Sequence, residues 1–280
     1  MLVIWSLVFA LLGFAAIGTA LLLWVRAQMH RAAVTNTRQQ PAPSVEQRVT
    51  SRFASPSRET ALSHVKRALQ IREPGKVEEW FRVGSASPET VVGFLRNRES
   101  VDGPITEYIW LSSMDANDLL LDGVAIKSKF EGKPRTRLAF LTPDDKGKWK
   151  IDFDAFARTV QPAWRDLMAM TAGEGLVRIL FSKDTYFNGP FMDETRWTCY
   201  RMASPDIPDD FSGYCRKDSP QAAAMKRMLV QSNVPNGINA LNRATLEIRR
   251  VAGAEPRQFE ITRVLAEDWV LSDTPFDATR

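Results

Sequence analysis

The sequence predicts an α+β protein, with an N-terminal transmembrane helix followed by two tandem units, each a helix on a curved antiparallel sheet. Three observations predict this fold class. Residues 2–25 contain no charged side chain. Ser-Pro pairs at Ser87 and Ser219 each open a helical pattern that leads into strand-like runs. Two similar tryptophan segments, KWKIDFDAF from residue 148 and DWVLSDTPF from residue 268, close these runs.

Length and composition indicate a folded protein. A chain of 280 residues has room for one large domain or two ordinary ones, and 44% hydrophobic and 25% charged residues are typical of globular proteins. The formal net charge is only +4, with the basic residues scattered along the chain. Nucleic acid is therefore not expected as a partner, because it requires a concentrated basic face.

Residues 2–25 are the first element. A helix of about 24 residues extends about 36 Å, which exceeds the hydrocarbon thickness of about 30 Å. Trp5 and Trp24 lie near its ends, where aromatic residues anchor a span at the membrane interfaces. The alternative is a cleaved signal peptide, but the segment lacks a basic n-region and is longer than a usual h-region. We expect a retained single-pass helix, with the lipid bilayer as its partner.

Residues 26–56 are polar and aperiodic, and they predict a flexible linker. This linker carries Arg26, Arg31 and Arg38. The positive-inside rule would place the C-terminal bulk in the cytoplasm. The cysteines discussed below argue for the extracytoplasmic side, which we favour for the C-terminal bulk.

The first unit is expected at residues 57–156 and the second at 157–280. Ser57 is placed to cap a helix that carries Val65 and Leu69 on one face. After the helix that begins at Ser87 come ITEYIWL, DLLLDGVAIKSKF, RTRLAFL and KWKIDF. After the helix that begins at Ser219 come RATLEIRRV, RQFEITRVL and DWVLS. These runs predict antiparallel strands.

The shared order of helix, strands and tryptophan segment predicts a duplication. Trp149 and Trp269 would then be buried at the same place, on the last strand of each unit. The alternative is two unrelated α+β segments, since a chain with eight Trp and fifteen Phe produces single matches by chance.

A helix on a curved sheet closed by the pattern W-x-[IL]-x-D-x-x-F resembles the cystatin/NTF2-like superfamily. The resemblance implies a cone-shaped sheet wrapped on a helix, often with a pocket. Members of the superfamily include isomerases, hydrolases, binding modules and membrane-anchored assembly proteins of secretion systems. The residues that carry the resemblance are Trp149, Ile151, Asp152 and Phe156, and then Trp269, Leu271, Asp273 and Phe276.

Cys199 and Cys215 flank SPDIPDDFSG, a stretch rich in turn formers and centred on Ile207. Folded as a symmetric hairpin, the two cysteines would face each other and could form a disulfide. A disulfide would indicate an oxidising compartment. The alternative is two buried free thiols.

The most unusual segment is DTYFNGPFMDETRW, residues 184–197, around the turn pair Asn188-Gly189. Its aromatic and charged side chains could line a pocket that binds a polar ligand. The alternative is a turn whose aromatic rings pack on the sheet. The candidate pocket residues are Tyr186, Phe187, Phe191, Glu194 and Arg196.

No catalytic residue, cofactor site or metal site is predicted from the known motifs. His64 is the only histidine of the expected folded part, and its helix, which also carries Lys66 and Arg67, suggests an exposed position. Asp152 and Asp154 are expected on the outward face of a strand, as solvated carboxylates.

Two functions remain open. The first is a membrane-tethered, non-enzymatic interaction or scaffold protein of the bacterial envelope, with an unknown protein partner or self-association. The second is a small-ligand binder, or an enzyme that uses a carboxylate as acid or base in a cone-shaped pocket. A hollow apolar cavity with an acidic side chain inside would favour the second.

Overall fold

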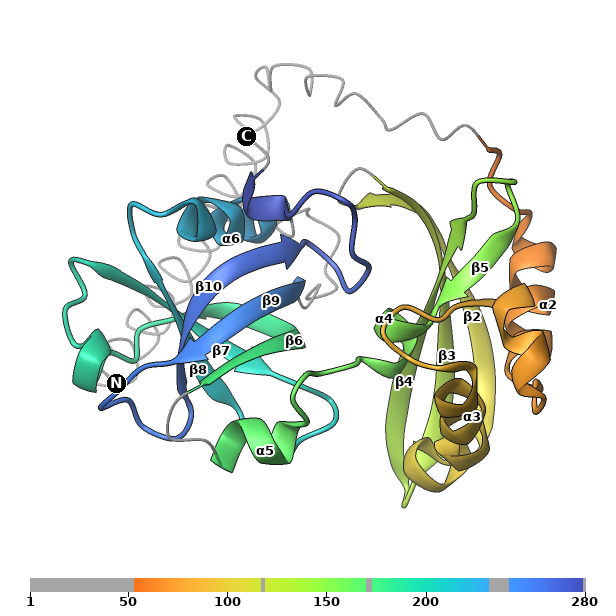
Figure 1. The fold of residues 1–280 in the computed structure, drawn as a ribbon, viewed down its shortest axis with the longest axis horizontal. Helices are drawn as coiled ribbons and strands as arrows, with labels where there is room; N and C mark the ends of the chain where they lie inside the picture. Colours follow the sequence, from red (N-terminus) through yellow and green to blue (C-terminus); the bar gives the residue numbers. More distant parts are fainter. Residues whose placement is uncertain (1–52, 117–118, 170–172, 232–241, 279–280) are drawn as a thin grey trace, which may run out of the picture. The chain divides into compact units, whose positions relative to one another are not determined.

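The computed structural model describes residues 53–116, 119–169, 173–231 and 242–278. Their strands form an open five-stranded sheet and a closed five-stranded barrel (Figure 1). The open sheet comes first in the chain, and the barrel follows it. We refer to each, with its helices, as the sheet lobe and the barrel lobe.

The sheet lobe has the strand order β1-β5-β4-β3-β2. All neighbours pair antiparallel except β1 and β5, which pair parallel. The turn at Asp144–Gly147 leads from β4 into β5, and the Asp144 side chain accepts hydrogen bonds from two backbone amides of this turn region. The strands are β1 (Phe81–Arg82), β2 (Ile105–Ala116), β3 (Leu119–Phe130), β4 (Lys133–Pro143) and β5 (Trp149–Asp152).

Serine caps begin the helices of this lobe, as the sequence predicts. The Ser57 hydroxyl accepts from the amide of Thr60 at the start of α2 (Arg58–Ala68). The Ser87 hydroxyl accepts from the amide of Thr90 at the start of α3 (Pro88–Asp102). Each cap satisfies an amide that has no partner inside the helix. A short 3-10 helix, η1 (Pro74–Glu79), lies between them.

Gly103 ends α3 because its backbone adopts φ +80°, a conformation that favours glycine. A Cβ at this position would lie 2.1 Å from the carbonyl oxygen of Lys129. The glycine therefore also allows the chain to pass close to β3 on its way into β2.

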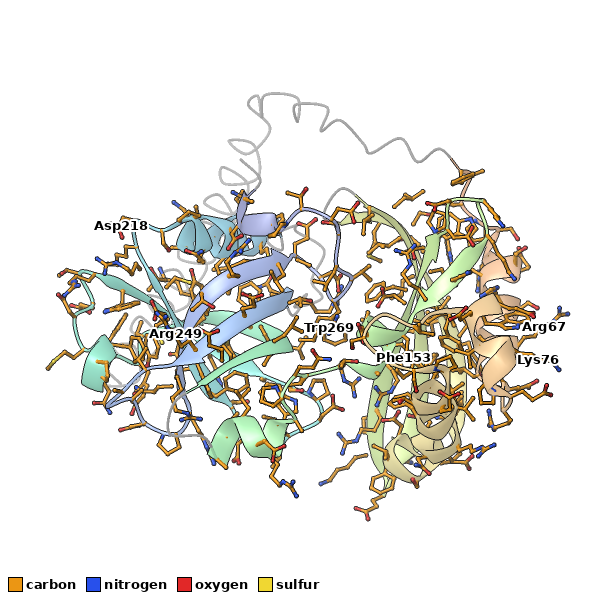
Figure 2. The ribbon with its side chains drawn as sticks, viewed as in Figure 1. Arg67, Lys76, Phe153, Asp218, Arg249 and Trp269 are labelled. Carbon is orange, nitrogen blue, oxygen red and sulfur yellow. The ribbon has the colours of Figure 1, made fainter. Side chains whose placement is uncertain are left out.

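Helices α2 and α3 lie on one face of the open sheet (Figure 1). Their buried residues Val65 and Leu95 belong to one apolar cluster with Val124 and Leu141 of the sheet. A charged pair lies beside this core: Arg137 on β4 donates to both carboxylate oxygens of Asp102, at 2.7 and 3.0 Å. Charged side chains on the outer side, such as Arg67 and Lys76 in Figure 2, are exposed.

The barrel lobe closes in the order β10-β8-β7-β6-β9, and pairing of β9 with β10 completes the ring. Only β8 and β10 pair parallel. On its outer side Arg249, labelled in Figure 2, donates to Glu260 at 2.6 Å. The strands are β6 (Gly173–Asp184), β7 (Trp197–Ala203), β8 (Phe211–Arg216), β9 (Asn242–Arg250) and β10 (Gln258–Ala266).

Alternate side chains of the barrel strands fill its interior, so the barrel has an apolar core. Phe181, Tyr200 and Met202 are buried there. Helix α6 (Pro220–Gln231) adds Met225 and Met228 to the same core. Ser219 lies just before α6, and its hydroxyl accepts from the amide of Ala222. The remaining short helices are α4 (Phe153–Ala157), α5 (Trp164–Ala169), η2 (Gly189–Phe191) and η3 (Phe276–Ala278).

The predicted fold class of two tandem cystatin/NTF2-like units is wrong. The second lobe is a closed barrel, whereas the first is an open sheet, so the two lobes are not copies of one arrangement. The physical reason is the pairing of β10 with both β8 and β9, which removes the edges that a curved open sheet would have.

The expected equivalence of Trp149 and Trp269 fails with it. Trp149 begins β5 and is only half-buried. Trp269 is 3% exposed and lies in an irregular segment after β10. There it packs with Leu121, Phe140 and Ala155, and its indole Nε1 donates to the carbonyl of Ile179. The two similar tryptophan segments therefore occupy different structural positions, one on a strand and one in an irregular segment.

The carboxylates of KWKIDFDAF are not solvated, contrary to expectation. Only residues 149–152 form a strand, and Asp152 caps α4 by accepting from the amide of Ala155 at 2.8 Å. Burial raises the pKa of Asp152. The Asp154 carboxylate accepts from the amide and hydroxyl of Ser85. Both carboxylates therefore stabilise the chain at the end of β5.

No helix among the described residues is long and apolar enough to cross a membrane. The predicted transmembrane helix at residues 2–25 and most of the predicted linker at 26–56 lie outside the described residues.

The predicted disulfide is also wrong: Cys199 and Cys215 are both buried free thiols. Strand pairing places Cys199 opposite Tyr214, and Cys215 opposite Thr198. This register is one residue away from the symmetric hairpin, and a shift of one residue turns a side chain to the other face. Cys215 accordingly lies in the barrel core, and Cys199 in a cluster with Phe191. The cysteines give no argument for an oxidising compartment.

Candidate functional site

The loop between β6 and β7, residues 185–196, contains all five sequence-predicted pocket residues. Its centre is the 3-10 helix η2, which begins after Asn188. Asn188 is extended and Gly189 adopts φ +54°, so the chain turns through Gly189 and Pro190, where the Phe191 amide donates to the Asn188 carbonyl at 3.0 Å. We call this segment the β6–β7 loop.

Phe191 anchors the loop. It is 1% exposed and lies parallel to the ring of Tyr214 on β8, with ring centroids 4.0 Å apart and an angle of 4° between the planes. The ring of Trp197 meets the Phe191 ring edge-on, with ring centroids 5.0 Å apart. With Cys199 these rings form a small apolar cluster separate from the barrel core. Burial of aromatic surface thus holds the loop against the strands.

Hydrogen bonds fix the first half of the loop. The Tyr214 hydroxyl donates to the carbonyl of Tyr186 at 2.9 Å, and it accepts from Gln258 at 3.1 Å. Glu255 accepts from the Tyr186 hydroxyl and from the Asn188 amide group, at 3.1 and 2.5 Å. Burial, and then the neighbouring Cys199, raise the pKa of Tyr214 well above its usual range. The phenol therefore remains protonated and keeps its donor role.

The loop nevertheless exposes apolar side chains. Met192, immediately after the buried Phe191, is 73% exposed, and Tyr186 is 46% exposed. Asp193 turns the chain back by accepting from the amide and hydroxyl of Thr195 at 3.0 and 2.6 Å. The hydrogen bond from the Thr195 hydroxyl lowers the pKa of Asp193 most, and the bond from the Thr195 amide lowers it further. The loop is thus firmly held from beneath while it displays a methionine and a tyrosine.

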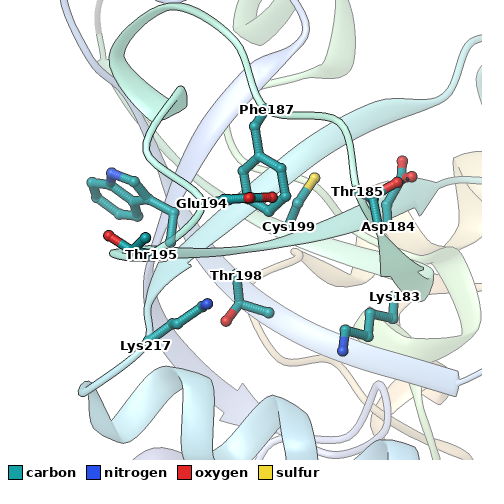
Figure 3. Close-up of a pocket in the computed structure, with 10 residues that line it drawn as sticks. Lys183, Asp184, Thr185, Phe187, Glu194, Thr195, Thr198, Cys199 and Lys217 are labelled. Carbon is teal, nitrogen blue, oxygen red and sulfur yellow. Dashed lines mark hydrogen bonds between the residues drawn. The ribbon is translucent and has the colours of Figure 1, made fainter.

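Two grooves flank the loop. The first has a volume of about 440 Å³ and lies along the start of β7 (Figure 3). The second has a volume of about 420 Å³ and includes Tyr186 and Glu255. The lining of the first groove comprises Lys183, Asp184, Thr185, Phe187, Glu194, Thr195, Trp197, Thr198, Cys199 and Lys217.

The structure separates the five predicted pocket residues. Phe187 and Glu194 line the first groove, and Tyr186 lines the second. Phe191 lies buried beneath the loop, as the packing alternative predicted. Arg196 is exposed and lines neither of these two grooves, so neither groove brings it together with Glu194.

Sequence reasoning missed the lysines of the first groove. Lys183 is the last residue but one of β6, and Lys217 follows β8. The two lysines are separated by 34 positions in the sequence, and only the pairing of β6, β7 and β8 brings them to one groove. The sequence around each lysine shows only a lysine near the end of a strand, which is too common a feature to predict a groove.

His64 is not the exposed residue that the sequence suggests. Its imidazole is partly buried against Trp80, with ring centroids 4.8 Å apart, and its Nε2 is buried. Burial lowers the pKa of His64, and nearby Lys148 lowers it further, against a backbone hydrogen bond with Trp80. A hollow of about 360 Å³ beside it is lined by residues of α2 and by Trp80.

The thiols of Cys199 and Cys215 are poorly suited to act as nucleophiles. Burial raises the pKa of Cys199 to about 11, and it raises the pKa of Cys215 further. A thiol with such a pKa carries almost no thiolate at neutral pH.

Comparison with known proteins gave no match: no family model, curated protein or solved structure matches this chain.

Proposed function

We propose that this chain is a non-enzymatic binding module that recognises another protein through the β6–β7 loop. One observation carries the proposal: the loop is anchored by the buried Phe191, and yet the next residue, Met192, is 73% exposed. A single exposed apolar side chain is common on protein surfaces, so Met192 is considered together with Tyr186, which the same anchored loop also exposes.

The anchoring favours binding for an energetic reason. A mobile loop loses conformational entropy when a partner orders it, whereas a preorganised loop loses little. The parallel rings of Phe191 and Tyr214 and the hydrogen bonds of Tyr186 hold this loop before any partner arrives. Tyrosine and methionine are also enriched in protein interfaces.

Site-specific photo-crosslinking tests the proposal. A photo-crosslinking amino acid replaces Met192 in the full-length chain, in the cells that produce the protein. The matched control places it at Val101, an exposed apolar residue of α3 in the sheet lobe (57% exposed). We expect a discrete cross-linked product from position 192 and none from position 101.

A further variant separates loop-specific contact from chance collision. Phe191→Ala removes the anchor and should reduce the cross-linked product at position 192. Equal products from positions 192 and 101, or no product at 192, would contradict the proposal. A product of twice the chain mass would identify the partner as a second copy.

A further inference from the structure

The first groove beside the β6–β7 loop has its positive charges on one side. Strand register places Lys183 opposite Tyr200, and Thr198 opposite Cys215. Paired residues share a face of a sheet, and residues two apart on a strand share it too. Lys183 and Thr198 therefore lie on the face of β6 and β7 that carries Tyr200 and Cys215 into the barrel core.

Figure 3 shows Lys183 and Lys217 on the same side of β7 as Thr198, with Thr198 between them. A backbone hydrogen bond holds the chain at Lys217, because the Lys217 amide donates to the carbonyl of Arg196 at 2.9 Å. Two ammonium groups and one hydroxyl thus face a common space from three different strand ends.

Within the described part of the chain, neither lysine has an acidic partner within 4.0 Å. Arginines of the same barrel behave differently. Arg243 pairs with Asp268 at 2.9 Å, Arg249 pairs with Glu260 at 2.6 Å, and Arg201 pairs with Asp210. The two lysine charges are therefore available to a ligand.

The acidic groups of the groove lie apart from the lysines. Glu194 lies beside Phe187 and Cys199, on the opposite side of β7 in Figure 3. Asp184 accepts from the amide of Thr185 at 2.7 Å, so one of its oxygens is engaged. An anion at the lysine side meets positive charge and a hydroxyl donor rather than these carboxylates.

We propose that this groove binds an acidic side chain of a partner polypeptide, whose carboxylate lies between Lys183 and Lys217 and accepts a hydrogen bond from Thr198. The inference rests on the proposed function, because it assigns an acidic segment to the partner that contacts the neighbouring β6–β7 loop. Charge complementarity selects the carboxylate, because Lys183 and Lys217 lie on the side of the groove away from Glu194.

Titration of the full-length protein with a short peptide of alternating Glu and Leu tests the inference. The companion probes are the same peptide with Gln in place of Glu, and inorganic phosphate. The test variant is K183Q/K217Q. The matched control, K129Q/K146Q, removes the same charge from two exposed lysines of the sheet lobe.

We expect the acidic peptide to bind the wild-type protein and the control equally. K183Q/K217Q should weaken that binding about tenfold or more, the size expected for lost charge-assisted hydrogen bonds. The Gln peptide should bind the wild-type protein no more tightly than the acidic peptide binds K183Q/K217Q. Added salt should weaken the binding of the acidic peptide to the wild-type protein. Thr198→Val should weaken it by a smaller factor.

Three results would overturn the inference: no binding of the acidic peptide, equal weakening by K183Q/K217Q and K129Q/K146Q, or tighter binding of phosphate than of the peptide. The last result would assign the site to a small free anion. These titrations require no natural partner. Their result is therefore independent of the cross-linking result at Met192, which tests the proposed function. Cross-linking with no peptide binding leaves the proposed function standing alone.

Discussion

The ring of Phe191 lies parallel to the ring of Tyr214, with centroids 4.0 Å apart, and this contact joins the β6–β7 loop to β8. The same Tyr214 donates its hydroxyl to the loop carbonyl of Tyr186. One tyrosine therefore holds the loop through its ring and through its oxygen. The shape of the candidate binding surface depends on this residue pair.

Phe191→Ala should lower the free energy of unfolding by about 3–5 kcal/mol, because a fully buried ring is lost and a cavity remains. Met192→Ala, one residue further on, should change it by no more than about 0.5 kcal/mol, because Met192 is exposed. Urea denaturation of both variants measures the difference. A small effect of Phe191→Ala would show that the loop is not anchored by this ring.

Thiol titration tests the assignment of Cys199 and Cys215. Because both are buried and their pKa values are raised, neither should react in the native protein at pH 8. Two thiols should react once the protein is denatured without a reducing agent. Fewer than two reactive thiols after denaturation would restore the disulfide prediction.

Local sequence signals predicted helices α2, α3 and α6 of this protein. Ser57 and Ser87 act as caps within three residues of their amide partners, so their effect is readable from the sequence alone. The Asn188-Gly189 pair likewise identified the centre of the candidate site. Each of these features depends on neighbours in the chain.

Features set by distant pairing were not predictable in this way. Closure of the barrel requires β10 to pair with β8, more than 40 residues away in the chain, and no local pattern encodes that choice. The register of β7 and β8 differs by one residue from the symmetric hairpin, and this single step turns Cys199 away from Cys215. The Lys183 and Lys217 groove depends on the same pairings.

The buried pair of Arg137 and Asp102 predicts a non-additive mutational effect. Their side chains are 5% and 9% exposed, and Arg137 also donates to the carbonyl of Phe156 at 2.9 Å. Asp102→Asn or Arg137→Met alone should cost about 3–5 kcal/mol, because each leaves a buried partner unpaired. The double variant D102N/R137M should cost less than the sum of the two. Strict additivity in denaturation experiments would contradict a direct pair.

His64 predicts that stability falls on the acid side of neutrality. In the unfolded chain its pKa is about 6.5. Burial lowers the pKa in the folded protein, and Lys148 acts in the same direction, so between the two values the unfolded state binds more protons. The contribution of a neutral His64 is therefore fully present above about pH 6.5, and it is lost as the pH falls from there towards the lower, folded pKa.

Urea denaturation of the wild-type protein and His64→Gln at pH 7.5, 6.5 and 5 checks this sign. Glutamine does not titrate, so the variant controls for all other groups. The free energy of unfolding of the wild type should decline relative to the variant as the pH falls. The physical cause is the cost of a charged imidazole held against Trp80 and near Lys148. Parallel pH curves for the two proteins would show that His64 is accessible to water and does not have a lowered pKa.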